Sequence, residues 1–382
     1  MTRDKLKIFQ EHLPYKDEPY IKKNWGNAMH SLCSYQGKLK PAIAYHLIKE
    51  FTAKGEMVLD PFCGIGTIPF EACLQERQGI GIDINPIAYA NTIAKISILD
   101  QNSIHREIEK LSMYISNNSI NEEDWEMVNI KLPINNGIIA DYYHNETLKE
   151  ILLARKYFLS LDYDSPELNF VKACVLHILH GNRPYALSKR SNNQTPLKPR
   201  VDEVAQYKNL VEKLNSKANR MIKSLHYGES FVKGRAIMDS LFNINDLNGQ
   251  IDIIITSPPF ADSTKFYSSN WLRLWFCGWD SSNFDGYKTQ FIDYRQKQNF
   301  DITYDEVFNY FYRVLKPNGR IILHLGKTNK IDMGRKISEI LLQNSKFDIL
   351  GLVEENVGHC NKHGIRDQGS TTEHQFLFIS RK

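Results

Sequence analysis

The sequence predicts an α/β fold built on a mostly parallel sheet of seven strands, with a helical insertion. Three observations indicate this fold. Short β-rich runs alternate with helical patterns, as in parallel sheets whose strands are joined by crossover helices. A glycine turn separates the first strand from the helix that follows it, and an acidic residue ends the next strand. The length of 382 residues is compatible with one large α/β domain that carries an insertion.

The first strand is predicted at 56–60, in "EMVLDPFCGIGTIPFEACLQE", and a glycine turn at 62–67 and a helix follow it. The second strand, in "GIGIDINP", ends at Asp83. A long stretch at 88–225 then has a mostly helical pattern, with one Pro- and Asn-rich break, "GNRPYALSKRSNNQTPLKP". Its last part, 203–223, has the pattern of an amphipathic helix.

Sheet patterning resumes after this stretch and supplies the other five strands. They are expected at 234–240, 251–260, 319–326, 347–356 and 374–381. The predicted organisation therefore has three parts: an N-terminal segment with the first half of the sheet domain at 1–99, a helical, basic insertion at 100–225, and the second half of the sheet domain at 226–382.

The composition, 42% hydrophobic and 24% charged, is that of an ordinary soluble globular protein. The N-terminal segment is too charged for a signal peptide, and no apolar run approaches the ~20 residues that a membrane helix needs. We therefore expect the chain in the cytoplasm, with no membrane contact.

The six cysteines are far apart and form no CxxC pair, which indicates reduced, mostly buried thiols. The nearest approach to a metal-binding pattern is "HCNKH", with His359, Cys360 and His363. This group lacks a fourth ligand, and a structural zinc site needs a closed set. We expect no bound metal.

The net charge of +4 is unevenly distributed. Between Arg183 and Lys223 ten lysines and arginines face three acids, so this segment carries +7 and the remainder −3. Such asymmetry favours a polyanion-binding face on an otherwise neutral protein. A solvated helix face at 203–223 is the alternative.

The glycine turn predicts a site for a negatively polarised ligand. Gly64 and Gly66 let the backbone approach a ligand closely, and the helix after them offers free N–H groups. Asp83 stands where a carboxylate can accept both hydroxyls of a ribose. A nicotinamide site would show a third glycine where Phe70 stands, whereas Asp60 can accept a hydrogen bond from an ammonium group. S-adenosylmethionine carries this ammonium and NAD does not, so S-adenosylmethionine is the expected cofactor.

A third acid, Asp239, ends the third predicted strand. It can accept a hydrogen bond from the amino group of an adenine. Alternatively, it caps a helix beside Ser240.

The run "TSPPF" ends the fourth predicted strand in a stiff extended turn, because two prolines cannot continue a strand ladder. The carbonyls of Ser257 and Pro258 then point into the cleft at the carboxyl ends of the strands. Together with the Ser257 hydroxyl they can hold an exocyclic amine for attack on a methyl group, and Phe260 offers a face for stacking a base. The alternative is a proline-rich turn after a buried strand.

The sequence resembles a known family in these motifs. "DPFCGIGT", "GIDINP" and "TSPPF" are similar to the cofactor and catalytic motifs of the exocyclic-amino DNA methyltransferases of bacterial restriction-modification systems. "YQGKLKPAIAYHLI" resembles the segment that encloses the methionine end of the cofactor, and "RVLKPNGRIILHLG" the passage from helix to fifth strand in class I methyltransferases. The resemblance implies a class I S-adenosylmethionine-dependent methyltransferase with a Rossmann-like sheet, in which the insertion recognises the target.

The resemblance also implies roles for individual residues. The catalytic loop would be Ser257, Pro258, Pro259 and Phe260. The cofactor would be bound by Lys40, Asp60, Pro61, Phe62, Cys63, Gly64, Gly66, Thr67, Asp83, Ile84 and Asp239. DNA would be bound by Arg183, Lys189, Arg190, Lys198 and Arg200 of the insertion, whose mixture of basic and amide side chains suits phosphate and base contacts.

The implied reaction is direct methyl transfer to a flipped base in double-stranded DNA, with a cognate restriction endonuclease as an independent partner. In the family, "TSPP" is associated with N4 of cytosine. Many amino-cytosine enzymes carry the two motifs in the opposite order, which keeps N6 of adenine as the alternative. An RNA guanine N2-methyltransferase and a non-catalytic nucleic-acid-binding module are further alternatives.

An aromatic run follows the catalytic loop. Trp271, Leu274, Trp275 and Trp279 recur at helical spacing, and we expect them in the core rather than in a base pocket.

Overall fold

The computed structural model describes most of the chain. The described residues are 3–22, 25–35, 37–129, 138–190, 196–199, 204–261, 269–279, 284, 286, 289–357, 361–362, 365–366 and 371–382.

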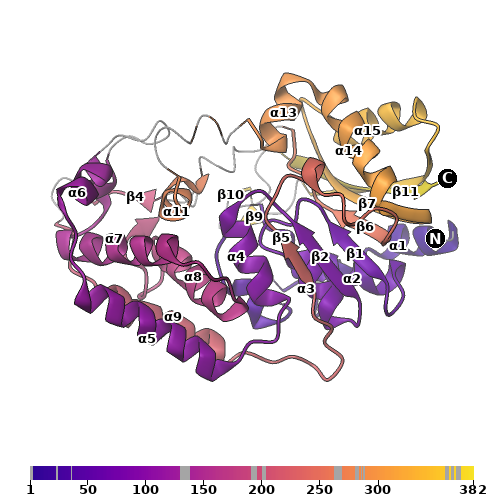
Figure 1. Ribbon diagram of the computed structural model, residues 1–382. Coiled ribbons are helices and arrows are strands. Elements are labelled where there is room, and N and C mark those ends of the chain that lie inside the picture. The colour runs from indigo at the N-terminus through magenta and orange to yellow at the C-terminus, as the bar shows by residue number, and fades with distance from the viewer. Residues whose placement is uncertain are drawn as a thin grey trace.

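A central sheet of seven strands organises the molecule (Figure 1). Its strands are β1 (Met57–Asp60), β2 (Gln78–Ile82), β5 (Arg235–Ile237), β6 (Ile251–Thr256), β7 (Leu315–Thr328), β8 (Phe347–Asn356) and β11 (Thr371–Arg381). They lie in the order β5-β2-β1-β6-β7-β11-β8. β11 is antiparallel to both β7 and β8, and the other neighbours are parallel. The predicted seven-stranded, mostly parallel sheet is confirmed.

Helices connect the strands and form the insertion. They are α1 (Arg3–His12), α2 (Pro41–Phe51), α3 (Thr67–Leu74), α4 (Pro86–Lys95), α5 (Gln101–Asn117), α6 (Glu122–Asn129), α7 (Asn145–Ser160), α8 (Pro166–Ile178), α9 (Leu210–Ile222), α11 (Trp271–Phe276), α13 (Ile292–Gln298), α14 (Phe300–Val314) and α15 (Met333–Leu342). Short 3₁₀ turns are η1 (Pro14–Lys16), η2 (Ala28–Ser31), η3 (Ile139–Tyr142) and η4 (Leu241–Asn243). Two small ribbons pair β3 (Lys189–Arg190) with β4 (Pro196–Leu197) and β9 (Asn361–Lys362) with β10 (Ile365–Arg366).

Strand β6 is covered by helices on both faces. Ile253 and Ile255 pack in a cluster with α1 and α2, whereas Ile254 packs in a second cluster with α14 and α15. All three are buried, which explains the apolar run at 253–255 in this central parallel strand. Helix α1 is held by aromatic contacts, since Phe9 lies 5.5 Å from the ring of Phe376 and 6.1 Å from that of Phe378 on β11.

The insertion forms a helical unit beside the sheet (Figure 1). Side chains of α5, α7, α8 and α9 share one buried cluster with α11. The aromatic run of α11 belongs to that cluster: Trp271, Leu274, Trp275 and Trp279 are buried, as predicted. Helix α11 therefore packs into the helical unit although it follows β6 in the chain.

Helix α9 is shorter than the expected helix at 203–223. The side chain of Asn209 accepts a hydrogen bond from the backbone N–H of Glu212 at 2.8 Å. This N-cap starts the helix at Leu210, and residues 204–209 precede it without regular structure.

Four cysteines, Cys33, Cys63, Cys73 and Cys174, are buried free thiols. Within the described ranges, no group of three or more His, Cys, Asp or Glu could hold a metal ion. The three residues of "HCNKH" considered for metal binding, His359, Cys360 and His363, lie outside the described residues. Among the described helices, none combines the length and hydropathy that crossing a bilayer requires.

Candidate active site

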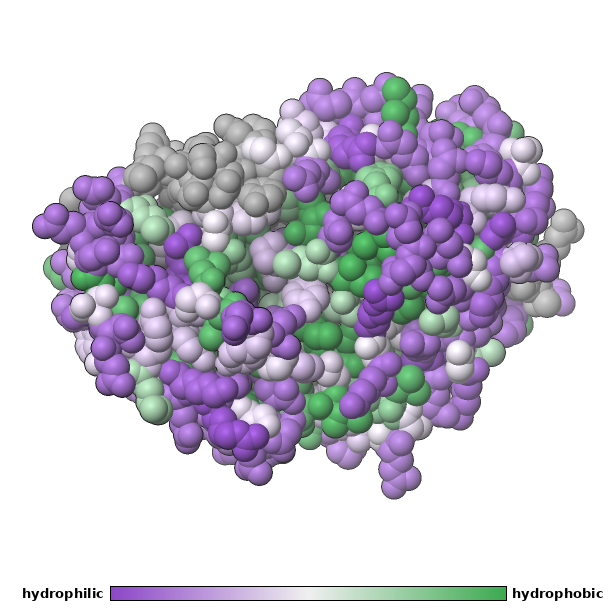
Figure 2. All heavy atoms as spheres, in the orientation of Figure 1, coloured by the Kyte–Doolittle hydropathy of each residue, from purple (hydrophilic) through white to green (hydrophobic). Residues whose placement is uncertain are grey.

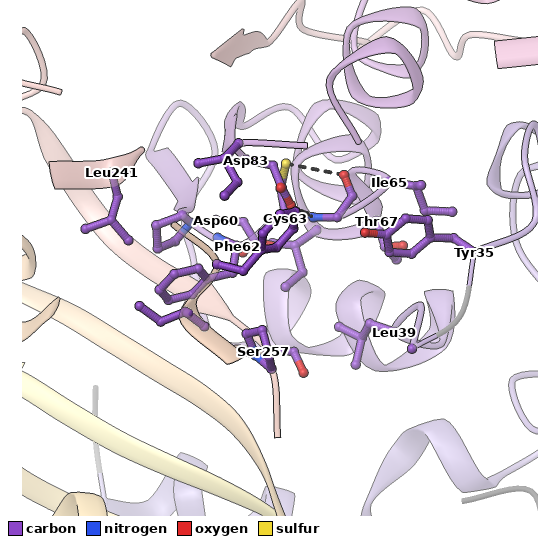
Figure 3. Close-up of a pocket in the computed structure, with 18 of the residues that line it drawn as sticks. Tyr35, Leu39, Asp60, Phe62, Cys63, Ile65, Thr67, Asp83, Leu241 and Ser257 are labelled. Carbon is purple, nitrogen blue, oxygen red and sulfur yellow. Dashed lines mark hydrogen bonds between the residues drawn. The ribbon is translucent and has the colours of Figure 1, made fainter. Parts of the chain in front are cut away.

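A pocket opens at the carboxyl ends of β1, β2 and β6, where open α/β sheets bind their ligands. Hydrophobic side chains gather in a hollow in the middle of the molecular face, between the helical unit and the sheet (Figure 2). In the pocket, Asp60, Asp83 and Ser257 approach one space from different strands, with Tyr35 and Leu39 on the side of α3 (Figure 3).

The loop after β1 is shaped by its glycines. Gly64 and Gly66 have left-handed backbones, with φ of +48° and +71°. A side chain at Gly66 would place its Cβ 2.6 Å from Oγ1 of Thr92 on α4, so only glycine fits there. The loop leads into α3 at Thr67, and Gly64 donates its N–H to Oδ2 of Asp83 at 2.9 Å.

Asp83 is fixed at the end of β2 by two backbone donors. Gly64 N–H binds Oδ2, and Asn85 N–H binds Oδ1 at 2.9 Å. Burial raises the pKa of the Asp83 carboxyl to about 6, and the backbone hydrogen bonds oppose that shift. Each oxygen keeps a further lone pair, so the carboxylate can accept the two hydroxyls of a ribose.

Asp60 lies deeper, at the junction of β1 and β6. Its Oδ1 accepts hydrogen bonds from Oγ1 of Thr256 at 2.6 Å and from the N–H of Phe62 at 3.2 Å. Burial raises the pKa of Asp60 to about 7, and the negative charge of Asp83 adds to the shift. A cationic ligand would relieve this cost, so the site suits the ammonium group that was expected.

The structure brings most of the predicted cofactor residues to the pocket. The lining includes Asp60, Pro61, Phe62, Cys63, Gly64, Thr67, Asp83, Ile84 and Asp239. Gly66 lies behind the loop as the N-cap of α3. Lys40 is the exposed N-cap residue of α2, and the residues that line the pocket from this segment are Lys38 and Leu39 instead.

Asp239 lies at the exposed rim of the pocket. Its Oδ1 accepts from the N–H of Ser240 at 2.6 Å and from Nδ2 of Asn243 at 2.8 Å. The side chain therefore braces the turn that leads into η4 and lies beside the pocket as well. It does not cap a helix, since the N-cap of η4 is Ser240.

Several lining residues were not predicted: Tyr35, Lys38, Leu39, Leu241, Phe242 and Phe291. Tyr35 accepts a hydrogen bond from Nδ2 of Asn85 at 3.1 Å, which ties the segment before α2 to the Asp83 turn. Burial raises the pKa of Tyr35 well above its ordinary value, so the phenol stays protonated. Tyr35, Lys38 and Leu39 all lie in the segment "YQGKLK", whose resemblance to the cofactor-enclosing region implied a role for Lys40 alone.

The loop "SPPF" leaves β6 at the edge of the same pocket, which Ser257 and Pro259 line. Oγ of Ser257 lies 3.0 Å from Nδ1 of His324 on β7. The carbonyl of Pro259 accepts from Nε2 of Gln296 on α13 at 3.0 Å. Pro258 is buried, so the loop is held from both sides.

Phe260 is half-buried beyond the prolines and turns toward β7 and β11. Its ring centroid lies 5.8 Å from that of His324 and 6.4 Å from that of His374. The ring lies over Gly326, where any side chain would collide with it. Phe260 is not among the residues that line the pocket.

The described members of the predicted DNA-binding group lie on the helical unit. Arg183 and Lys189 are exposed, and Nζ of Lys198 forms an ion pair with Oδ2 of Asp141 at 2.6 Å. Arg190 belongs to the ribbon strand β3, and Arg200 lies outside the described residues.

Two lysines of the basic segment 183–223, which carries +7, point into the protein. Lys217 is buried and donates to the carbonyl of Ser31 at 2.9 Å, and Lys208 donates to the carbonyl of Ala186 at 2.7 Å. These two lysines bind backbone rather than face solvent. The charge available to a polyanion is therefore smaller than the sequence count indicates.

Comparisons with known proteins agree with the motifs. Residues 3–95 match a family model described as DNA methylase. The chain is 25% identical over 320 residues to the type II methyltransferase M.BsoBI of Geobacillus stearothermophilus, an alignment that covers 72% of this chain and 60% of the relative. The chain thus spans less than two thirds of that relative's length. The predicted resemblance to exocyclic-amino DNA methyltransferases is confirmed.

Two solved structures were also matched at low similarity. A TehB-like SAM-dependent methyltransferase from Corynebacterium glutamicum is 10% identical, with 89% of this chain and 86% of that chain covered and a TM-score of 0.31. A SAM-dependent methyltransferase from Methanosarcina mazei is 10% identical, with 88% and 96% covered and a TM-score of 0.33. The predicted class I fold is confirmed on the sheet itself: counted along the chain, its strands lie in the order 3-2-1-4-5-7-6, a Rossmann-like core with one antiparallel strand near its edge.

Proposed function

We propose that this chain is a DNA methyltransferase that moves a methyl group from S-adenosylmethionine to the exocyclic amino nitrogen of a base. The observation that carries the proposal is that Asp60 at the end of β1, Asp83 after β2 and Ser257 after β6 all line one pocket. The family match over residues 3–95 and the likeness to a type II methyltransferase support it. N4 of cytosine is the proposed target atom, and N6 of adenine is the alternative.

The pocket offers a partner for each polar end of the cofactor. Asp60 would accept from the ammonium group, Asp83 from the ribose hydroxyls and Asp239 from the adenine amino group. When bound, S-adenosylmethionine supplies a methyl group on a positively charged sulfur. The apolar walls from Phe62, Ile84 and the other lining residues would keep water away from it.

The catalytic loop would hold the target amine. The Ser257 hydroxyl, together with a carbonyl of the proline turn, accepts the N–H groups of the amine, so that its lone pair faces the methyl group. Gln296 fixes the loop through the Pro259 carbonyl. The amino nitrogen of the base would attack the methyl group directly and in line, so no covalent enzyme intermediate would form.

The target base has to leave the duplex, at a cost of a few kcal/mol. Phe260 would stack on the flipped base with the part of its ring that is not covered by His324. Arg183 and Lys189 of the helical unit would bind phosphates of double-stranded DNA. A cognate restriction endonuclease would act on the same sites as an independent partner.

The test is to incubate the protein with S-adenosylmethionine and mixed-sequence duplex DNA and to identify methylated nucleosides by mass spectrometry. N4-methylcytosine, formed far more slowly by Ser257→Ala, is the expected result. N6-methyladenine would keep the mechanism and overturn the proposed base. Unmethylated DNA, despite measurable cofactor binding, would reject the DNA proposal and favour structured RNA as the substrate. Absence of cofactor binding would leave a nucleic-acid-binding module.

A further inference from the structure

Four polar residues form a line across the sheet, starting at the catalytic loop. They are Ser257 after β6, His324 on β7, His374 on β11 and Glu355 on β8. His324, His374 and Glu355 are all buried. The register brings them together, since Thr256 pairs with Leu323, His324 with Phe376, and His374 with Glu355.

The line occupies one face of the sheet. Each of the four polar residues is two positions away from an apolar residue that belongs to the buried cluster with α1 and α2. In the order of the line, these apolar residues are Ile255, Ile322, Phe376 and Val353. Because strand side chains alternate between faces, the four polar residues continue that face toward the carboxyl end of the sheet. An apolar face thus becomes polar where the catalytic loop begins.

His324 is the member that contacts the catalytic loop. Its Nδ1 lies 3.0 Å from Oγ of Ser257. Its ring is held between the ring of His374, at 4.7 Å, and that of Phe376, at 5.0 Å. A buried imidazole fixed in this way can hold a hydroxyl in a single orientation.

The direction of this hydrogen bond decides what Ser257 can do. If Nδ1 accepts the hydroxyl proton, both lone pairs of Oγ stay open to the N–H of an amine. If Nδ1 carries a proton, it donates to Oγ, which then has one lone pair fewer for the substrate. The first arrangement suits the proposed function, because it turns the hydroxyl proton toward His324 and leaves Nδ1 able to receive that proton.

We propose that His324 is a positioning residue for methyl transfer: its unprotonated Nδ1 holds the Ser257 hydroxyl so that Oγ accepts an N–H of the target amine. The inference rests on the proposed function and deepens it. During transfer the N–C bond forms as the C–S bond breaks, and the bonding pair stays on sulfur. The amine then loses one proton to Oγ of Ser257, whose own proton passes to Nδ1 of His324 and later to solvent.

The surroundings of His324 keep it neutral, so one of its two ring nitrogens is an acceptor. Burial lowers the pKa of His324 well below its ordinary value, and the neighbouring His374 lowers it further. The pKa of His374 is itself lowered to about 4, mainly by burial. Glu355, at 3.8 Å from His374, is engaged by the hydroxyl of Tyr15 at 2.7 Å and by Lys16 at 3.4 Å.

A double-mutant cycle tests the inference in the full chain. His324→Phe keeps an aromatic ring and removes the acceptor, and we expect it to slow single-turnover methyl transfer about ten- to a hundredfold. In a Ser257→Ala background the same substitution should change the rate less than about twofold, because its effect passes through the hydroxyl. His324→Asn, which places an amide oxygen near the position of Nδ1, should restore most of the rate.

His46→Phe is the matched control, since it replaces a buried imidazole on α2 that contacts the rings of Tyr20 and Tyr45 and does not line the pocket. It should leave the transfer rate within about threefold of the original chain. Equal losses in His324→Phe and His46→Phe, or a loss that persists in Ser257→Ala, would assign His324 a purely structural role and overturn the inference.

A second readout does not depend on activity. Two-bond ¹H–¹⁵N spectra of ¹⁵N-histidine protein report which ring nitrogen carries the proton, and we expect Nε2–H with a bare Nδ1 at His324. Ser257→Ala should shift the Nδ1 resonance. A protonated Nδ1 would overturn the inference even in an active enzyme. An original chain that methylates no DNA would instead reject the proposed function, whatever the tautomer.

Discussion

At the scale of single residues, we expect Asp60 to couple cofactor binding to pH. Its pKa, raised from 3.8 to about 7 by burial, means that the folded chain keeps a proton which the unfolded chain releases. The unfolding free energy therefore falls as pH rises from about 4 to about 7, and a bound ammonium group reverses this loss. We expect the affinity for S-adenosylmethionine to rise with pH up to about 7 and then to level off.

Isothermal titration calorimetry between pH 6.5 and pH 8 measures this dependence, in a range where Asp83, with a pKa of about 6, is mostly ionised. Asp60→Asn should weaken binding about ten- to a hundredfold, the value of a charge-assisted hydrogen bond, and remove the rise with pH. A rise that survives in Asp60→Asn would assign the proton to another group.

Gly66 gives a second prediction at this scale. Gly66→Ala forces a left-handed residue with φ near +71° and a Cβ against Thr92, so both strain and collision destabilise the loop. Gly249→Ala is the matched control, because φ is +65° there and nothing lies within 4 Å of the added Cβ. We expect Gly249→Ala to cost about 1–2 kcal/mol of unfolding free energy and Gly66→Ala clearly more, with loss of cofactor binding.

Chemical denaturation of the two variants separates the cost of backbone strain from the cost of the collision. Strain is common to both variants, whereas the collision with Thr92 occurs only in Gly66→Ala. Equal costs in the two variants would mean that the loop moves away from α4 without penalty.

Single residues also mark the limit of what the sequence can predict. Asp60, Gly64 and Asp83 were predictable because a strand-turn-helix unit fixes its own local geometry. His324 and Tyr35 were not, since each reaches the site through strand register or loop packing that no local pattern encodes. Lys40 was expected at the cofactor but lies outside the pocket. It is the N-cap residue of α2, and the preceding residues Lys38 and Leu39 line the pocket instead.

At the scale of elements, α11 is tied to both parts of the molecule by Arg273. This buried side chain donates from Nε to the carbonyl of Leu176 at 2.9 Å, and from Nη1 and Nη2 to the carbonyl and Oγ of Ser34 at 2.8 and 2.9 Å. Leu176 belongs to α8, and Ser34 precedes Tyr35 of the pocket. One guanidinium therefore links the helical unit to the cofactor site.

We expect Arg273→Leu to lower the unfolding free energy by about 3 kcal/mol, because it leaves buried carbonyls without their donor. It should also weaken S-adenosylmethionine binding, since the Tyr35 segment loses its anchor. Arg220→Leu, at an exposed position on α9, should stay within about 0.5 kcal/mol. Unchanged stability in Arg273→Leu would show that neighbouring groups or water replace these bonds.

Strands were predicted more accurately than the boundaries and packing of helices. All seven strands of the central sheet were predicted, because each is a short β-rich run bounded by turn residues. The start of α9 was predicted at 203 but lies at Leu210, because the cap at Asn209 and not the hydrophobic pattern determines where the helix begins. The packing of α11 against the insertion depends on contacts between distant segments and has no local signature.

At the scale of the whole molecule, DNA binding should follow the charge on the helical unit. A double substitution of the exposed Arg183 and Lys189 by alanine should weaken binding to duplexes of any sequence. If each contacts one phosphate, the slope of log affinity against log salt falls by about 0.9 per contact, and so by about 2 in total.

Fluorescence anisotropy over a salt series measures the slope. The control is Lys54→Ala, an exposed lysine between α2 and β1 whose ion pair is with Glu76. An unchanged slope in the double variant would place the DNA on another face.

The contact of α1 with β11 affects how the chain can fold as it is made. Phe9 packs on Phe376 and Phe378, and Tyr15 binds Glu355, more than 300 residues downstream. Vectorial synthesis exposes the apolar sides of α1 and α2 long before β11 leaves the ribosome. Helix α2 can pack on α3 as soon as both are made, whereas α1 cannot reach its final contacts before β11, so its apolar side stays exposed to aggregation during synthesis.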